Sequence, residues 1–390
     1  MRYIRLHVAD ILAAYDGSLP LTHFLKQHFK QHTKLGSRDR KLISEMVYAY
    51  YRFAKAIAAA DKDTQIDIAL LLLDTQNRHA RALVAELWQP FFGKPLPERM
   101  AAIKAAGYDI NFELLLPADL SFSEGIARAD WLTSMGQQPR LFLRLQPGYE
   151  QQVYRRLQAA DIAYGICNEQ CISLENGVAA DQVLDPASYR VQDLSSQQTA
   201  TYFRVAAGDR CWDCCSGAGG KSLLLTERQP RIRLTVSDIR PSILENLSER
   251  FLRYRYPQPR RIVLSAADAA QTAQKLGEQR FDLILSDVPC SGAGTWARTP
   301  EQLYFFDPSG LTAFTERQQA IAGNVVRYLK PGGTFIYITC SVFAAENEQV
   351  VARLLQTQPD LYLEQQQLIN GLAQSADSMF LAVIRKAGNN

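Results

Sequence analysis

The chain has 390 residues, of which 47% are apolar and 21% are charged, and its formal net charge is +3. At about 150 residues per domain, this length predicts two or three domains, and the composition excludes a disordered, collagen-like or disulfide-scaffold protein. No run approaches the ~18–20 apolar residues that span a bilayer, and the first residues lack the pattern of a signal peptide. We therefore expect a cytoplasmic, monomeric protein with no membrane partner.

Cysteine and histidine are unevenly placed along the chain. The seven cysteines are odd in number and irregular in spacing, which argues against a disulfide framework. Cys211 and Cys214 have the spacing of half a zinc site without a matching pair, so we expect free thiols and no metal. All five histidines lie before residue 80, so chemistry in the rest of the chain cannot use a histidine base or a Ser-His-Asp triad.

Positive charge is concentrated in two segments. Residues 1–60 contain ten Lys and Arg against four acids, and residues 240–261 contain six Arg against two Glu. Each segment could be a solvated face, but two such clusters in a nearly neutral chain favour a polyanionic partner. The first cluster includes Lys34, Arg38 and Arg40.

Residues 1–135 predict a helical domain, and residues 136–190 predict a small α+β subdomain. In the first segment, apolar residues recur at three- and four-residue steps, which is typical of amphipathic helices, and we expect six or seven of them. In the second segment, the expected elements are a strand at 141–145, a helix at 150–159 and strands at 163–167 and 171–174.

Residues 191–390 alternate between strand and helix. This alternation predicts a doubly wound, mostly parallel, seven-stranded Rossmann-like α/β domain with helices on both faces of the sheet. The expected strands are 210–213, 233–238, 261–264, 281–286, 334–338, 361–363 and 379–385.

Acidic side chains stand at or just after the ends of four successive strands. They are Asp213, Asp238, Asp268 and Asp287. Ligands of open α/β sheets bind beyond these ends, so the four acids predict a site with several acceptors for one ligand.

The first of these strands leads into a glycine-rich turn at residues 215–221, which fits neither the Walker A nor the G-x-G-x-x-G spacing. Such a turn still lets a ligand approach the backbone at a helix N-terminus. Asp238 is placed to accept hydrogen bonds from a ribose diol. Together these features suit S-adenosylmethionine.

Two cysteines follow the ends of neighbouring predicted strands: Cys290 and Cys340. A single cysteine there would usually be a small core residue, but two thiols beside Asp287 favour a nucleophile in a domain without histidine. A thiolate that adds to C6 of cytosine makes C5 able to accept a methyl group, provided the base is unstacked. Lys221 and Asp287 could hold the polar edge of that base.

The sequence resembles the Sun/Nol/Nop family of RNA cytosine-C5 methyltransferases, especially its bacterial ribosomal-RNA branch. The double signature, Pro-Cys at one strand end and Thr-Cys at the next, is highly specific. The segments that carry the resemblance are 191–197, 213–221, Asp238, Asp268, 287–295, 330–333, 339–341 and 346–348.

The resemblance implies roles for individual residues. Cys340 would be the nucleophile, Cys290 would assist product release, and Lys221 and Asp287 would complete the catalytic set. Lys34, Arg38 and Arg40 would lie in a helical domain that binds RNA, ribosomal RNA above all, and the 140–145 segment resembles a small RNA-binding subdomain. The cofactor, S-adenosylmethionine, would be bound by Cys215, Ser216, Gly217, Ala218, Gly219, Gly220, Lys221, Asp238, Asp268 and Asp287.

Three departures and two alternatives remain. Ala218 stands where the family usually has Pro, and Val288 where Ala is usual, and both changes are small and apolar. Cys214 and Cys215 are adjacent, although one Cys is typical there. One alternative is a non-catalytic RNA-binding or assembly factor, although both thiols, Lys221 and every strand-end acid are present. The other is a methyltransferase acting on a protein or small molecule, which the basic N-terminal domain and the two thiols disfavour.

Overall fold

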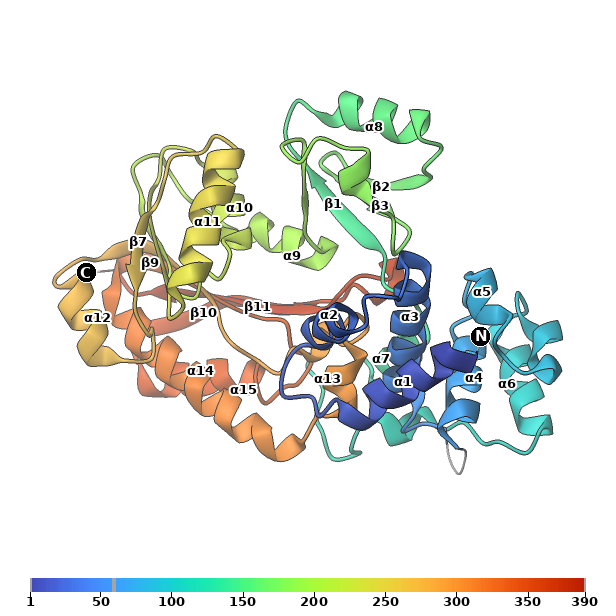
Figure 1. Ribbon diagram of the computed structural model, residues 1–390. Helices are drawn as coiled ribbons and strands as arrows, with labels where there is room; N and C mark the ends of the chain where they lie inside the picture. The colour runs from blue at the N-terminus through green and yellow to red at the C-terminus, as the bar shows by residue number, and fades with distance from the viewer. Residues whose placement is uncertain (1, 58–60, 389–390) are drawn as a thin grey trace. The chain divides into compact units, whose positions relative to one another are not determined.

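The computed structural model describes residues 2–57 and 61–388 (Figure 1). The chain forms two compact units. The helical unit comprises Met1–Leu120, Arg128–Gln138 and Thr295–Pro308, and the sheet unit comprises Ser121–Ala127, Pro139–Gly294 and Ser309–Asn390. Within the described residues, every helix is too short or too polar to cross a membrane.

The helical unit has the helices that the apolar periodicity predicted. Its longest helix, α3, buries Leu42, Met46 and Val47 on one face. Side chains fix several helix starts: Asp61 accepts a hydrogen bond from the backbone of Thr64 at the start of α4. The α-helices are α1 (Arg2–Ala14), α2 (Leu21–Gln31), α3 (Ser37–Phe53), α4 (Lys62–Leu72), α5 (Arg78–Arg81), α6 (Leu96–Ala105) and α7 (Arg128–Ser134), with 3₁₀ turns at Glu86–Phe91 and Phe112–Leu115.

A distant segment completes the helical unit. Residues 295–308 carry the short helix α13 (Pro300–Tyr304), whose Tyr304 ring lies 5.1 Å from that of Tyr51 on α3. The buried guanidinium of Arg52 donates to the carbonyl of Ala297 over 2.6 Å. The unit is therefore closed by chain that the sequence analysis assigned to the α/β domain.

The sheet unit begins with a small antiparallel sheet of order β2-β3-β1-β4, covered by helix α8. Arg144 and Arg190 of this sheet are buried, and both form ion pairs with Glu227 at the end of helix α10 (Gly220–Arg228). The elements are β1 (Leu141–Leu145), α8 (Glu150–Ala159), β2 (Tyr164–Asn168), β3 (Cys171–Leu174) and β4 (Tyr189–Val191). Sequence reasoning found the first four to within one residue and missed β4, a three-residue strand.

The larger sheet has seven strands in the order β10-β11-β9-β8-β5-β6-β7. β9, β8, β5, β6 and β7 are parallel, and β11 pairs antiparallel with β9 and with β10. This confirms the predicted doubly wound, mostly parallel fold. The strands are β5 (Arg210–Asp213), β6 (Arg233–Asp238), β7 (Arg260–Val263), β8 (Phe281–Asp287), β9 (Leu329–Thr339), β10 (Leu361–Ile369) and β11 (Met379–Lys386).

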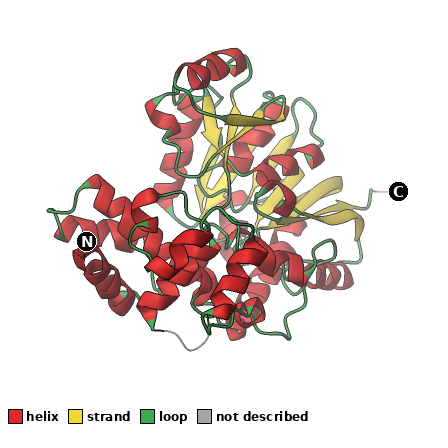
Figure 2. Cartoon of the chain, turned by 90° about the vertical axis from the view of Figure 1, so that its right-hand side faces the viewer, coloured by secondary structure: helices red, strands yellow, loops and turns green. Residues whose placement is uncertain are grey.

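Helices cover both faces of this sheet, as Figures 1 and 2 show. One buried cluster joins strand residues to α10 and α11, and another joins them to α12, α14 and α15. Because these strands are parallel, their carboxyl ends meet at one edge of the sheet, where ligands bind in such folds. The helices are α9 (Leu194–Gln198), α10 (Gly220–Arg228), α11 (Pro241–Arg253), α12 (Ala269–Leu276), α14 (Leu311–Val325) and α15 (Glu348–Thr357).

Candidate active site

The glycine-rich turn between β5 and α10 has a backbone that only glycine adopts readily. Gly217 and Gly219 have φ of 50° and 79°, in the left-handed region. A Cβ on Gly219 would also lie 2.7 Å from the side chain of Leu247. The turn leads directly into the N-terminus of α10, where an anionic group is favoured.

The remaining residues of this turn are held by neighbours in the same unit. The Ser216 hydroxyl donates to the carbonyl of Ser237, and Arg250 donates to the carbonyl of Ala218 over 2.6 Å. Cys215 is partly buried, while Cys211 and Cys214 lie in the core beside β5.

Asp238 ends β6 beside the turn and is already hydrogen-bonded. Its carboxylate accepts from the N–H of Gly217 (3.1 Å) and from the Nε of Arg240 (2.9 Å). Burial alone would raise the pKa of Asp238, but the hydrogen bonds and charge of Arg240 outweigh it and hold that pKa below its usual value. The guanidinium thus stands at the oxygens that the sequence analysis assigned to a ribose.

Asp268 occupies a different kind of place. It is exposed, and its carboxylate accepts from the backbone N–H of Gln271 and so caps the start of α12. Asp268 therefore has a structural role as the cap of α12. Its role in cofactor binding remains a prediction.

Three charged groups lie together at the ends of β5 and β8. Lys221, which is buried, donates from Nζ to Asp287 over 2.6 Å, and Asp213 accepts from the hydroxyl of Ser222. Among the described residues, no side chain or backbone group hydrogen-bonds to the other Asp213 oxygen. Burial raises the pKa of Asp213 to about 7; the charge of Asp287 adds to this shift, and Ser222 and Lys221 oppose it.

The two thiols predicted to share the chemistry do lie together. The Sγ atoms of Cys290 and Cys340 are 3.3 Å apart, and both residues are partly exposed. Hydrogen bonding to Cys340, together with burial and the Cys340 and Glu346 charges, raises the pKa of Cys290 well above its usual value.

A buried carboxylate links the two loops that carry these thiols. Glu346 accepts from the backbone and hydroxyl of Ser291, next to Cys290, and from the hydroxyl of Ser341, next to Cys340. Gln318 on α14 donates to the same carboxylate and to the carbonyl of Pro289, each over 3.0 Å. Sequence analysis placed Glu346 in a matching segment without giving it a role, and it did not find Gln318.

Gly294 brings the same two loops into backbone contact. Its N–H donates to the carbonyl of Cys340 over 2.8 Å. A Cβ at this position would lie 2.0 Å from the carbonyl oxygen of Ser378. Only glycine allows the chain to pass there, which fixes the loop after Cys290 against the end of β9.

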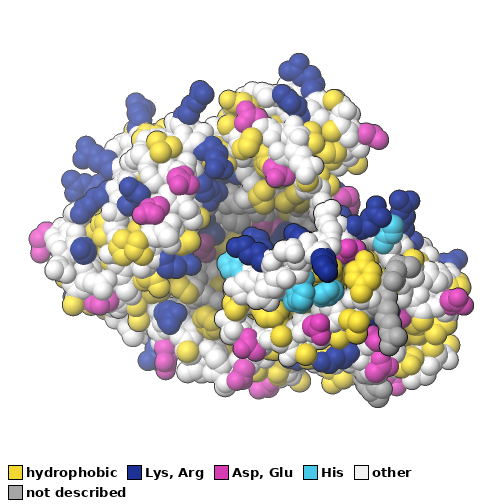
Figure 3. All heavy atoms as spheres, in the orientation of Figure 1, with side chains coloured by type: hydrophobic (Ala, Val, Ile, Leu, Met, Phe, Trp, Pro, Cys, Tyr) yellow, Lys and Arg dark blue, Asp and Glu magenta, His cyan; other side chains and the backbone are white. Residues whose placement is uncertain are grey.

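The predicted RNA-binding residues lie between α2 and α3 and at the start of α3. Lys34 and Arg38 are exposed, whereas Arg40 is partly buried and donates from Nε to the carbonyl of Leu35. In the sheet unit, Figure 3 shows Lys and Arg side chains over the region of α11. This region carries the second basic cluster, residues 240–261.

Known proteins resemble this chain over part or most of its length. The family model described as 16S rRNA methyltransferase RsmB/F matches residues 200–385, which confirms the resemblance drawn from the motifs. Ribosomal RNA small subunit methyltransferase B of Xanthomonas campestris is 35% identical over 170 residues, and that of Xylella fastidiosa is 33% identical over 223. These matches cover 44% and 56% of this chain, and the chain spans only 38% and 51% of the relatives' length.

Solved structures share the fold at low sequence identity. PH0851 is 17% identical with a TM-score of 0.69, over 93% of both chains. NSun6 from Pyrococcus horikoshii, solved with SFG, is 14% identical with a TM-score of 0.57, over 67% of this chain and 94% of that one.

The raised pKa of Asp213 predicts a pH dependence of stability. An Asp with a pKa of about 3.9 when unfolded and about 7 when folded contributes stability that is fully present below pH 4 and is lost as the pH rises through 7. Asp213→Asn mimics the protonated acid. Relative to the parent, its free energy of unfolding should gain about 3 kcal/mol between pH 5 and pH 8.

Urea unfolding of both proteins at the two pH values measures this gain. The exposed acid Asp181, replaced by Asn, serves as the control and should show no such gain. A difference between Asp213→Asn and the parent that stays constant with pH would contradict the assignment.

Proposed function

We propose, from the premise that residues 200–385 form a methyltransferase domain of the RsmB/F family, that this chain methylates carbon 5 of a cytosine in ribosomal RNA. The methyl donor would be S-adenosylmethionine, and the reaction would pass through a covalent bond between Cys340 and C6 of the base. The observation that carries the proposal is the pair of thiols 3.3 Å apart at the ends of two adjacent parallel strands.

The residues of the turn fit this cofactor. The left-handed Gly217 leaves open space where a Cβ would lie, and the carboxylate of Asp238 is beside it. One buried oxygen of Asp213 faces no hydrogen-bond donor among the described residues. When bound, S-adenosylmethionine supplies an electrophilic methyl group. The turn at 216–220 and Asp238 would bind it, provided that the Arg240 guanidinium leaves the Asp238 carboxylate.

The chain's own residues account for the order of the chemistry. The Cys340 thiolate adds to C6 of the base, and the electron pair of the broken C5–C6 π bond makes C5 nucleophilic. Asp287, which forms an ion pair with Lys221, is the carboxyl group that would contact the polar edge of the base. After methyl transfer a base must remove the C5 proton while the bond between Sγ of Cys340 and C6 breaks, returning the thiolate.

Cys290 is suited to this last step. Its Sγ lies 3.3 Å from that of Cys340, and so close to any base that is attached to Cys340. Cys290 can accept the C5 proton only as a thiolate, so its own proton passes to solvent before this step. The two thiols thus act in sequence, with Cys340 first and Cys290 second.

The two cysteines can be separated by substitution. Cys340→Ala should abolish both the RNA adduct and methylation, because the nucleophile is gone. Cys290→Ala should still form the adduct but fail to resolve it, so protein crosslinked to RNA should accumulate. Denaturing gels of each variant with RNA and S-adenosylmethionine measure this, and mass spectrometry of nucleosides identifies the product. An adduct with Cys340→Ala, or none with folded Cys290→Ala that binds cofactor, would overturn the assignment.

Asp238 is predicted to strengthen cofactor binding, and Arg240, which occupies the Asp238 carboxylate, is predicted to weaken it. Asp238→Ala should weaken S-adenosylmethionine binding by about ten- to a hundredfold, since one charge-assisted hydrogen-bonded pair contributes ~1.5–3 kcal/mol. Arg240→Gln should bind at least as tightly as the parent, because it frees the carboxylate. Calorimetric titration measures both, and unchanged affinity in folded Asp238→Ala would refute the role.

RNA affinity is predicted to depend on Lys34, Arg38 and Arg40. Replacing all three with Gln should weaken RNA binding. The plot of log K, where K is the association constant for RNA, against log salt concentration should also become shallower, by about 0.7–0.9 for each phosphate that these side chains neutralise in the parent. The matched control replaces three exposed lysines of the same unit: Lys62, Lys94 and Lys104. Equal slopes for the two triple variants in fluorescence-anisotropy titrations would show that the cluster does not bind RNA.

A further inference from the structure

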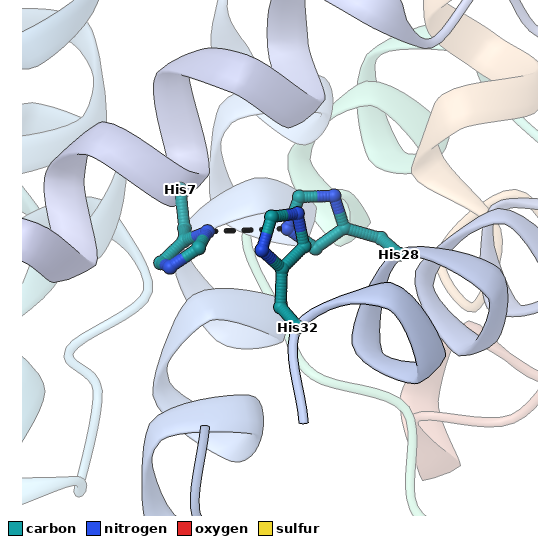
Figure 4. Close-up of side chains that lie close together, drawn as sticks. All are labelled: His7, His28 and His32. Atoms are coloured by element: carbon teal, nitrogen blue, oxygen red, sulfur yellow. Dashed lines mark hydrogen bonds between the residues drawn. The ribbon is translucent and has the colours of Figure 1, made fainter. Parts of the chain in front are cut away.

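Three histidines from two helices converge in the helical unit. His7 lies on α1, His28 lies on the last turn of α2, and His32 is the C-cap residue of α2. One ring nitrogen from each lies within 4.8 Å of the others, and all three side chains are partly exposed (Figure 4). The sequence analysis counted the histidines but could not bring His7 and the α2 pair together, and it predicted no metal.

The spacing of the rings suits shared ligation. Nδ1 of His7 and Nε2 of His28 are 3.3 Å apart. Two imidazole nitrogens on one tetrahedral zinc, each about 2.0–2.1 Å from the metal, are about 3.3 Å apart. A direct hydrogen bond between them would more commonly be about 2.9–3.0 Å long. The rings of His28 and His32, one helical turn apart, have centroids separated by 4.3 Å.

The surroundings favour a cation. The last carbonyls of α2 carry the negative end of the helix dipole close to His28 and His32. The carboxyl group of Asp10, which interacts with His28, adds an acidic side chain to the surroundings of the cluster.

We propose that His7, His28 and His32 bind one divalent transition-metal ion, with zinc as the representative, and leave a fourth position for water. Three imidazoles suit zinc, copper, nickel or cobalt and do not suit magnesium or calcium, which prefer oxygen ligands. The site is independent of the methyltransferase chemistry. A bound ion would tie α1 to the end of α2, two residues before Lys34, and so would fix the start of the predicted RNA-binding segment.

Zinc titration of the full chain tests the proposal. The protein is stripped with EDTA, dialysed, and titrated with zinc chloride in competition with a chromophoric chelator. We expect the parent to bind one zinc ion at this site. The affinity of the protein for that ion should fall at least about tenfold in His28→Gln and in His32→Gln. His23→Gln is the matched control, because His23 is exposed on the same helix and outside the cluster. Unchanged zinc affinity in folded His28→Gln would overturn the proposal.

The absorption spectrum of bound cobalt(II) distinguishes this site from the seven thiols of the chain, and the parent protein alone is enough for this test. Ligation by imidazole and water gives visible d–d absorption without a thiolate charge-transfer band in the near ultraviolet. We expect such a spectrum from the parent at the first equivalent of cobalt, and the same spectrum from His23→Gln. A spectrum with only thiolate-bound cobalt, or no cobalt binding, would refute the site.

Discussion

The buried carboxylate of Glu346 is the interaction on which the arrangement of the two thiols depends. It lies between the loops that follow β8 and β9 and accepts hydrogen bonds from Ser291 and Ser341, each next to a cysteine. A carboxylate with several donors is stabilised in the interior, whereas the same donors without it would be buried and unpaired. The 3.3 Å separation of the sulfurs therefore depends on the hydrogen bonds of Glu346 as well as on the pairing of β8 with β9.

Much of the fold could be predicted from local pattern. Strands β5 and β6 were found with their bounds, because each is a short segment that begins with Arg, ends in an acid and is followed by turn residues. β9 and β10 were predicted too short, since the Pro-Gly-Gly segment at the start of β9 and the polar outer residues of β10 hide their strand character. Periodicity does not report pairing with a neighbouring strand, which is what extends both.

The parts of the site that could not be predicted depend on contacts between residues far apart in sequence, or on a competing side chain. Glu346 reaches Ser291 across 55 positions. The sequence placed Asp238 correctly at a strand end but gave no sign that Arg240 would take its carboxylate. The three histidines belong to two helices whose contact no local pattern encodes. Residue type and strand register together predict which chemistry is available, but not which partners hold it.

The segment 295–308 has a consequence for how the protein is made. Domains usually fold in turn as the chain leaves the ribosome, N-terminal first. Here the helical unit cannot finish in that order, because the carbonyl that receives the guanidinium of Arg52 and the aromatic partners of α3 are synthesised about 250 residues later. Most of the strands of the large sheet emerge before the first unit is complete. The loop that carries Cys290 and the segment 295–308, which completes the helical unit, are therefore synthesised one after the other. The helical unit and the sheet unit must then finish folding together.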